Sequence, residues 1–316
     1  MGINSFIFNS SEMKKVIILL LTVILGCYVV DRIGSKVCDV IHKNSDGITA
    51  SKYRHLFNDC DEEMVLLGTS RCEAHYVSSI ISDSLGLKVY NGGVDASDNI
   101  FSHYSTLCLM LRHHTPRFIG LELSHTDFAE MPDPFNTMSY LAPYIGKDEE
   151  VDNIFRLAGS YWKYQISHLY RYNAKIMADL AGYVIPYGEK SQDGYLKKGK
   201  PTVAPHKKDT MPSAYTIDTL KVLYLNKFVT KCKDKKIQLF CMISPSYDKA
   251  ETTTYSFLHD WAKENGILLL DFHTSGLFSD NPDMFYDNRH LCDDGATRYT
   301  SIFVHTLKEN PQKIIK

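Results

Sequence analysis

Five short apolar segments alternate with longer, more polar stretches along this chain, and this alternation limits the folds that it can adopt. The apolar segments cover residues 64–68, 88–91, 117–123, 237–244 and 267–271, and turn or polar residues bound each of them. The stretches between them predict helices at residues 70–85, 97–114, 216–233 and 255–265. Strands that alternate with helices form parallel sheets with helices on both faces. We therefore predict an α/β domain built on a five-stranded parallel sheet.

One long segment, residues 128–213, interrupts this alternation. It contains a predicted helix at residues 153–180 that is rich in aromatic residues, followed by a polar stretch. We interpret the segment as an insertion near the edge of the sheet that would carry a site, with a role in substrate choice. A surface elaboration that only covers the sheet is the simpler alternative.

The amino terminus carries an apolar run that predicts a membrane segment. Lys14 and Lys15 precede fifteen apolar or small residues, 16–30, and Asp31 and Arg32 close the run. Fifteen residues span about 22 Å as a helix, against a hydrocarbon core of about 30 Å, but flanking basic side chains can extend to the interface. We predict a cytoplasmic tail at 1–15, an uncleaved signal anchor at 16–33, and an extracytoplasmic domain at 34–316.

Two alternatives for the amino terminus stay open. A cleaved signal peptide would require a site of the Ala-x-Ala type, which the sequence does not show. A lipoprotein would use Cys27, which follows Leu25 and Gly26 in a sequence that roughly resembles a lipid-attachment box. Each alternative also places the residues from about 35 onward outside the cytoplasmic membrane.

Composition argues against several classes of function. The formal net charge is −2, and lysine and arginine are spread along the chain, so we expect no nucleic-acid partner. Eight cysteines are widely spaced without a Cys-x-x-Cys pair, which argues against a zinc site or a disulfide framework. We predict no metal and no organic cofactor.

Three residues have the chemistry of a serine hydrolase. Ser70 follows Gly68 and Thr69 at the end of the first predicted strand, where a helix begins. Asp287 and His290 lie after the fifth predicted strand. Ligands of open parallel sheets bind outside the carboxyl ends of the strands, so the topology predicts that these residues converge. Ser70 would be the nucleophile, His290 its base, and Asp287 the group that orients the imidazole.

Simpler interpretations exist for each of these residues. Serine is a common N-cap of helices, and an Asp-x-x-His pair can be a local capping interaction. The second predicted strand ends in Asn91, Gly92 and Gly93, where a backbone N–H or the Asn91 side chain could stabilise an oxyanion. A tight turn explains the two glycines equally well.

Together these motifs resemble the SGNH/GDSL hydrolase superfamily over about residues 60–310. The resemblance rests on Gly68-Thr69-Ser70, Asn91-Gly92-Gly93, and Asp287-x-x-His290 with Gly295 downstream. It implies a three-layer, flavodoxin-like fold, a Ser70–His290–Asp287 triad, and an oxyanion contact at Gly92 or Gly93. Two departures stand out: Thr69 replaces the acidic residue of the first block, and residues 120–127 contain no asparagine where the third block belongs.

With its anchor, the chain most resembles the membrane-tethered branch that assists acyl transfer onto cell-envelope polymers, of the D-alanyl-lipoteichoic acid and alginate O-acetylation types. We therefore expect a serine-dependent esterase or O-acyltransferase that acts on an envelope glycan or glycopolymer. The expected location is the bacterial inner membrane, with one span, an extracytoplasmic domain and possible association with a multispanning acyltransferase. The alternative is a non-catalytic component of the same kind of complex. A nucleotide-binding flavodoxin-like protein is disfavoured, because no glycine-rich phosphate loop follows the first strand.

Overall fold

The fold is known from a computed structural model that describes residues 10–97, 99–124, 127–185, 193–201, 216–247 and 253–310. Its centre is a sheet of five strands in the order β2-β1-β3-β4-β5, and every neighbouring pair is parallel. The strands are β1 (Met64–Leu67), β2 (Val89–Asn91), β3 (Phe118–Glu122), β4 (Gln238–Ile243) and β5 (Leu268–Asp271). The predicted five-stranded parallel sheet is thus confirmed.

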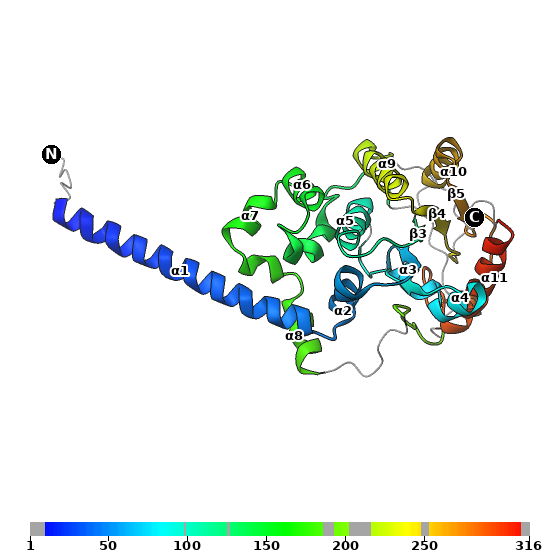
Figure 1. The fold of residues 1–316 in the computed structure, drawn as a ribbon, viewed down its shortest axis with the longest axis horizontal. Coiled ribbons are helices and arrows are strands. Elements are labelled where there is room, and N and C mark those ends of the chain that lie inside the picture. The colour runs from blue at the N-terminus through cyan, green and yellow to red at the C-terminus, as the bar shows by residue number, and fades with distance from the viewer. Residues whose placement is uncertain are drawn as a thin grey trace, which may run out of the picture.

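Two apolar layers, one on each face, bury the sheet. Val65 and Leu67 of β1 face one core, whereas Met64 and Leu66 face the other, as the two-residue period of a strand requires. The first core includes side chains of α5 (Ile100–Met110), α9 (Thr219–Asp234) and α10 (Thr253–Asn265). The second includes side chains of α4 (Ser78–Leu85) and α11 (Asp293–Lys308). Figure 1 shows these helices on opposite sides of the strands, so the predicted three layers are present.

The helix predicted at residues 70–85 is in fact two helices, α3 (Ser70–His75) and α4. Side chains from elsewhere in the fold take the backbone groups at the break. The Asn91 amide donates to the carbonyl oxygens of Cys72 at 2.7 Å and Tyr76 at 2.9 Å. Thr300 of α11 accepts the Val77 N–H at 3.0 Å. The single-helix prediction was wrong because these partners are distant in sequence.

The single helix predicted at residues 153–180 is also wrong. The structure has η2 (Asn136–Tyr144), α6 (Glu149–Leu157), α7 (Tyr161–Ile166), η3 (Leu169–Tyr172) and α8 (Ile176–Val184) in this region. Gly159, with φ of 67°, ends α6 in the left-handed conformation that glycine adopts readily. Helices η2 and α6 pack against α5, η3 and α8 pack against α1 (Ser10–Asn44), and α7 packs against α6 and η3.

Only part of the remaining insertion belongs to the described residues. Residues 193–201 lie beside β2 and the start of α11: the Asn91 N–H donates to Asp193 O, and the Asp293 N–H donates to Gly199 O. Residues 186–192 and 202–215 lie outside the described part. The predicted role of the insertion in substrate choice stays a prediction.

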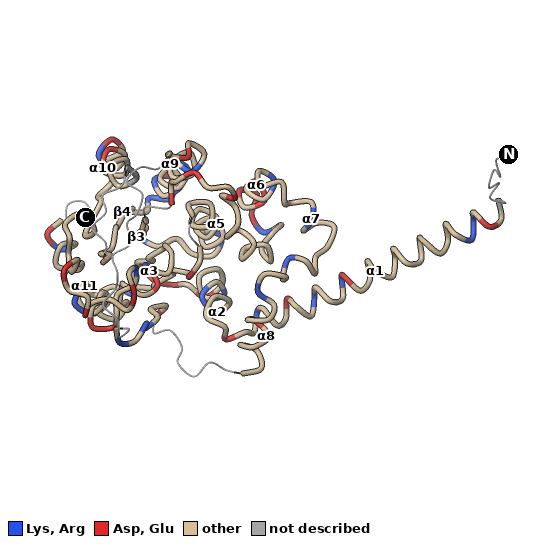
Figure 2. Tube along the Cα trace, turned by 180° about the vertical axis from the view of Figure 1, so that it is seen from behind, with Lys and Arg blue, Asp and Glu red and all other residues tan. Residues whose placement is uncertain are grey.

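Helix α1 has two parts with different surroundings. Residues 16–30 are exposed along the helix and carry no acidic or basic side chain, which Figure 2 shows as an uninterrupted tan stretch. Beyond Asp31 the same helix continues to Asn44 and packs against α8, η3 and α2 (Ile48–Arg54). At 35 residues it is about 52 Å long and is apolar enough to cross a membrane. The helical segment is therefore longer than the predicted anchor at 16–33, and its second half is part of the folded domain.

Candidate active site

Ser70 lies at the carboxyl end of β1, at the first position of α3. Thr69 caps this helix, and its hydroxyl accepts the Arg71 N–H at 3.3 Å. Gly68 makes the turn from strand to helix in a place without room for a side chain. A Cβ there would be 2.7 Å from Cβ of Cys72 and 2.9 Å from Cβ of Glu122. The strand and the close packing at Gly68 thus fix the position of the Ser70 hydroxyl.

Asp287 and His290 lie on a tight loop between the 3₁₀-helix η4 (Pro282–Met284) and α11. An antiparallel bridge between Phe285 and Leu291 closes the loop at its base. Within it, one carboxylate oxygen of Asp287 accepts the N–H groups of Arg289 and His290, each at 2.8 Å. Asp287 therefore shapes the loop that carries His290.

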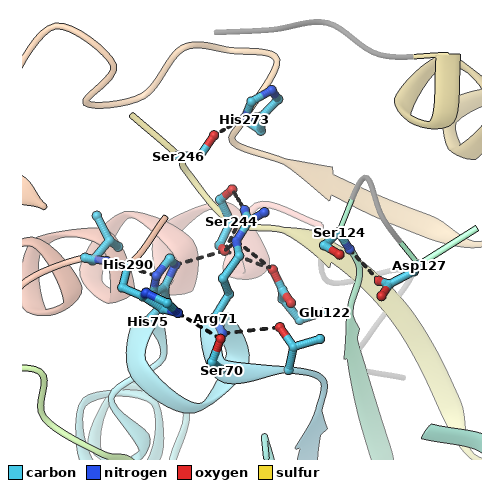
Figure 3. A network of polar contacts seen from close by, with 12 residues as sticks. Ser70, Arg71, His75, Glu122, Ser124, Asp127, Ser244, Ser246, His273 and His290 are labelled. Atoms are coloured by element: carbon cyan, nitrogen blue, oxygen red, sulfur yellow. Dashed lines mark hydrogen bonds and ion pairs between the residues drawn. The ribbon is translucent and has the colours of Figure 1, made fainter. Parts of the chain in front are cut away.

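The structure brings Ser70, His290 and Asp287 together in one hydrogen-bonded series. Ser70 Oγ lies 2.8 Å from His290 Nε2, and His290 Nδ1 lies 2.9 and 3.0 Å from the two carboxylate oxygens of Asp287. A carboxylate can only accept, so Nδ1 carries the proton and Nε2 of the neutral ring accepts the Ser70 hydroxyl. This is the arrangement in which an imidazole can act as base toward a serine. Figure 3 shows the Ser70 and His290 side chains pointing toward each other.

The surroundings of Asp287 favour its ionised form. Burial raises the pKa of this carboxyl, but hydrogen bonds from the His290 ring and from the Arg289 and His290 N–H groups outweigh burial and hold its pKa below the ordinary value. Its side chain remains 43% exposed, and that of His290 is 18% exposed. The imidazole is thus held beside a permanent negative charge while the site stays open to solvent.

A buried polar network lies beside this series, where β3, β4 and α3 meet. Arg71 Nε lies 3.4 Å from a carboxylate oxygen of Glu122, and the same oxygen accepts the Ser244 hydroxyl at 2.9 Å. The Arg71 guanidinium also donates to Ser244 Oγ and O. Glu122 is fully buried and Arg71 is 6% exposed, so an ion pair here must be closely matched to offset its loss of water. The sequence prediction did not include this network.

His75 joins the network to the loop of His290. Its Nε2 accepts the Leu291 N–H at 2.9 Å, so its Nδ1 must be the protonated nitrogen and donate to Ser244 Oγ at 2.9 Å. Burial first, and then the positive charge of Arg71, lower the pKa of His75 well below its ordinary value. A neutral His75 therefore ties the residue after His290 to the core (Figure 3).

Asn91, Gly92 and Gly93 have their donors occupied inside the fold. The Gly92 N–H donates to Leu66 O at 2.8 Å, and the Gly93 N–H donates to Asn91 Oδ1 at 3.0 Å. The Asn91 amide donates to the carbonyls at the end of α3. The predicted oxyanion role of these residues stays a prediction, and these hydrogen bonds argue against it.

Lys52 and Glu73 form a second buried ion pair behind Gly93. Lys52 Nζ lies 2.9 Å from Glu73 Oε1 and donates to the Gly93 carbonyl at 2.5 Å. Both side chains are at most 1% exposed. This pair fixes the backbone at Gly93 against α3.

One group of potential metal ligands occurs among the described residues. Donor atoms of His55, Cys60 and Glu62 lie within 4.8 Å of one another. These residues precede β1, so they lie near the opposite end of that strand from Ser70. His55 Nε2 is paired with Glu62 Oε1 at 2.8 Å. The group is separate from the candidate active site.

Comparison with known proteins adds little to this geometry. No protein-family profile matches the chain, and no curated protein sequence matches it significantly. Among solved structures, the chain is similar to a provisionally assigned acylhydrolase from Bacteroides fragilis, with 10% sequence identity and a TM-score of 0.39. The match covers 82% of this chain and 93% of that one. Similarity at this level does not indicate a function, so any functional assignment depends on the residues of the site.

Proposed function

We propose that this protein is a serine-dependent esterase or O-acyltransferase that forms an acyl-enzyme on Ser70. The observation that carries the proposal is the continuous series from Ser70 Oγ through the His290 ring to the Asp287 carboxylate. A hydroxyl, an imidazole of defined tautomer and an ionised carboxylate are the groups that acyl transfer requires. The three residues lie outside the carboxyl ends of parallel strands, and open parallel sheets bind ligands at this edge.

The reaction begins when Ser70 Oγ attacks the carbonyl carbon of an ester and its proton moves to His290 Nε2. Asp287 stabilises the imidazolium that results. The tetrahedral intermediate collapses as the carbon–oxygen bond to the leaving alcohol breaks, and His290 returns the proton to that alcohol. Water or an acceptor hydroxyl then attacks the acyl group by the same steps and restores Ser70. Water gives hydrolysis, and a sugar hydroxyl gives transfer.

The developing oxyanion requires at least one hydrogen-bond donor close to Ser70. The first N–H groups of a helix have no acceptor within the helix, and the Ser70 N–H occupies such a position in α3. The Arg71 side chain does not serve this purpose, because its guanidinium is directed to Ser244 and Glu122. We propose the Ser70 N–H as the oxyanion donor.

We further propose that the acceptor is a cell-envelope glycan or glycopolymer and that the domain is extracytoplasmic. A single helix near the amino terminus, apolar and long enough to cross a membrane, supports anchoring. Lys14 and Lys15 precede the apolar run, which favours a cytoplasmic amino terminus under the positive-inside rule. A chain fixed beside the bacterial inner membrane could receive its acyl group from a multispanning acyltransferase.

The test is hydrolysis of p-nitrophenyl acetate by the full-length chain in detergent, because the second half of α1 packs into the domain. Ser70→Ala and His290→Ala should each lower the rate by at least about 10⁴-fold. Ser301→Ala, an exposed serine of α11, should leave the rate unchanged. Activity that survives Ser70→Ala would refute an acyl-enzyme on this residue.

A non-catalytic binding component is the second candidate, and one observation favours it. The donors of Asn91, Gly92 and Gly93 are all used inside the fold, which leaves few groups to stabilise an oxyanion. This candidate predicts that wild-type protein neither hydrolyses esters nor reacts with a fluorophosphonate probe. It also predicts that Ser70→Ala binds an envelope glycan as well as the wild type does.

A further inference from the structure

Helix α1 joins the apolar run rigidly to the domain, because its second half packs into the domain. The helix runs from Ser10 to Asn44 without a break, and its residues beyond Asp31 pack against η3 and α8. No flexible linker therefore separates the apolar run from the domain. If residues 16–30 cross a membrane, the elements packed on α1 directly after this run must lie at the membrane surface.

The α7–η3 connection is bound to α1 at the residue where the apolar run ends. The Asp31 carboxylate accepts the Ser167 hydroxyl at 2.5 Å and the N–H groups of His168 at 2.9 Å and Leu169 at 3.2 Å. Arg32 donates to the Gln165 carbonyl. One carboxylate with three donors holds this connection at a fixed level along the helix.

Four of the five exposed residues of α7 and η3 are apolar or aromatic, and the fifth is Lys163. Trp162 is 71% exposed and Ile166 is 77% exposed, and their spacing places them on one face of α7. Leu169 and Tyr170 of η3 are also exposed. In Figures 1 and 2, α7 is the labelled helix of the globular body that reaches furthest in the direction of the amino-terminal half of α1.

We propose that Trp162, Ile166, Leu169 and Tyr170, here called the α7 surface, lie in the interfacial layer of the phospholipid bilayer that α1 crosses. This inference rests on the anchoring proposed above. The bilayer is favoured as the occupant because Leu169 of the α7 surface donates its N–H to Asp31, the residue directly after the apolar run of α1. Tryptophan, tyrosine and nearby lysine are the residues that concentrate at this layer, and Lys163 lies over the Tyr164 and Tyr170 rings. The domain would then have two membrane contacts and one orientation.

The two tryptophans of the chain provide a direct test. Trp162 is exposed, whereas Trp261 is buried and donates to Asn226. The full-length Trp261→Phe variant, reconstituted into phosphatidylcholine and phosphatidylglycerol vesicles, reports on Trp162 alone. The control places the only tryptophan at Met177 through Met177→Trp, Trp162→Phe and Trp261→Phe. Met177 is 75% exposed on α8, which pairs with α1 at His42, about 16 Å further along the helix than Asp31.

We expect iodide to quench Trp162 severalfold less than the tryptophan at position 177, and lipids brominated near the carbonyl end of their chains to quench Trp162 selectively. If Trp261→Phe fails to fold, the quenching of Trp162 fluorescence is obtained from the difference between the wild type and Trp162→Phe. Carbonate extraction first establishes integration, and release of the protein would refute both the anchoring and this inference. An integrated protein with Trp162 open to iodide and insensitive to brominated lipid would refute the inference alone. Protection that requires an added membrane protein, without quenching by lipid, would also refute it.

Discussion

The buried ion pair of Arg71 and Glu122 should contribute measurably to the free energy of unfolding. Their closest charged atoms are 3.4 Å apart, which corresponds to about 5 kcal/mol of attraction at an effective dielectric constant of about 20. Glu122→Gln removes this attraction and leaves the Arg71 charge buried without its carboxylate. Breaking one side of a buried pair costs about 3–5 kcal/mol of unfolding free energy. We expect a loss of this size.

The assay is unfolding by denaturant of the full-length chain in detergent. The matched control is Glu63→Gln, since Glu63 also pairs with an arginine, Arg117, at 2.8 Å, but both side chains are at least 36% exposed. The control should change stability by less than about 1 kcal/mol. The double change Arg71→Met with Glu122→Leu should cost less than the two single changes together, because removal of both charges leaves neither one buried alone. Equal effects of Glu122→Gln and Glu63→Gln would refute the reasoning.

Two further predictions concern the histidines and their partners. Asp287→Asn should lower esterase activity by about 10³–10⁴-fold, because an amide no longer holds the His290 ring in the tautomer that accepts from Ser70, and the rate with p-nitrophenyl acetate checks this. His103 is buried on α5, and burial lowers its pKa from 6.5 to about 4. The unfolded chain therefore binds the proton more tightly, so stability should fall as pH drops below about 6.5, by about 2 kcal/mol for this residue at about pH 5. His103→Leu should reduce this loss, measured by denaturant unfolding at about pH 5 and above about pH 6.5. A pH dependence of stability that is unchanged in the variant would contradict the role assigned to His103.

The strands were predictable because each carries a run of apolar side chains on both faces. The predicted residues 64–68 and 267–271 correspond to Met64–Leu67 and Leu268–Asp271. The parallel order then requires the carboxyl ends of the strands to share one edge. For this reason the sequence was sufficient to predict that Ser70 would meet Asp287 and His290, which the structure brings within hydrogen-bonding distance.

What the sequence did not show depends on partners that are distant along the chain. The break after His75 results from Asn91 and Thr300, and neither signals its effect locally. The Arg71–Glu122 pair had a weak signal, a lone carboxylate in the otherwise apolar stretch 118–123. Arg71 could not be identified as the partner of Glu122 without the fold. An arginine that follows a candidate nucleophile can be exposed at the surface as readily as buried in an ion pair.

Covalent labelling by a fluorophosphonate probe, mapped by peptide mass spectrometry on the full-length chain, tests the proposed nucleophile most directly. We expect one adduct, on Ser70. It should be absent in Ser70→Ala, form much more slowly in His290→Ala, and form at the wild-type rate in Ser301→Ala. Labelling at another serine, or none on folded wild-type protein, would contradict the claim that the Ser70–His290–Asp287 series activates a nucleophile.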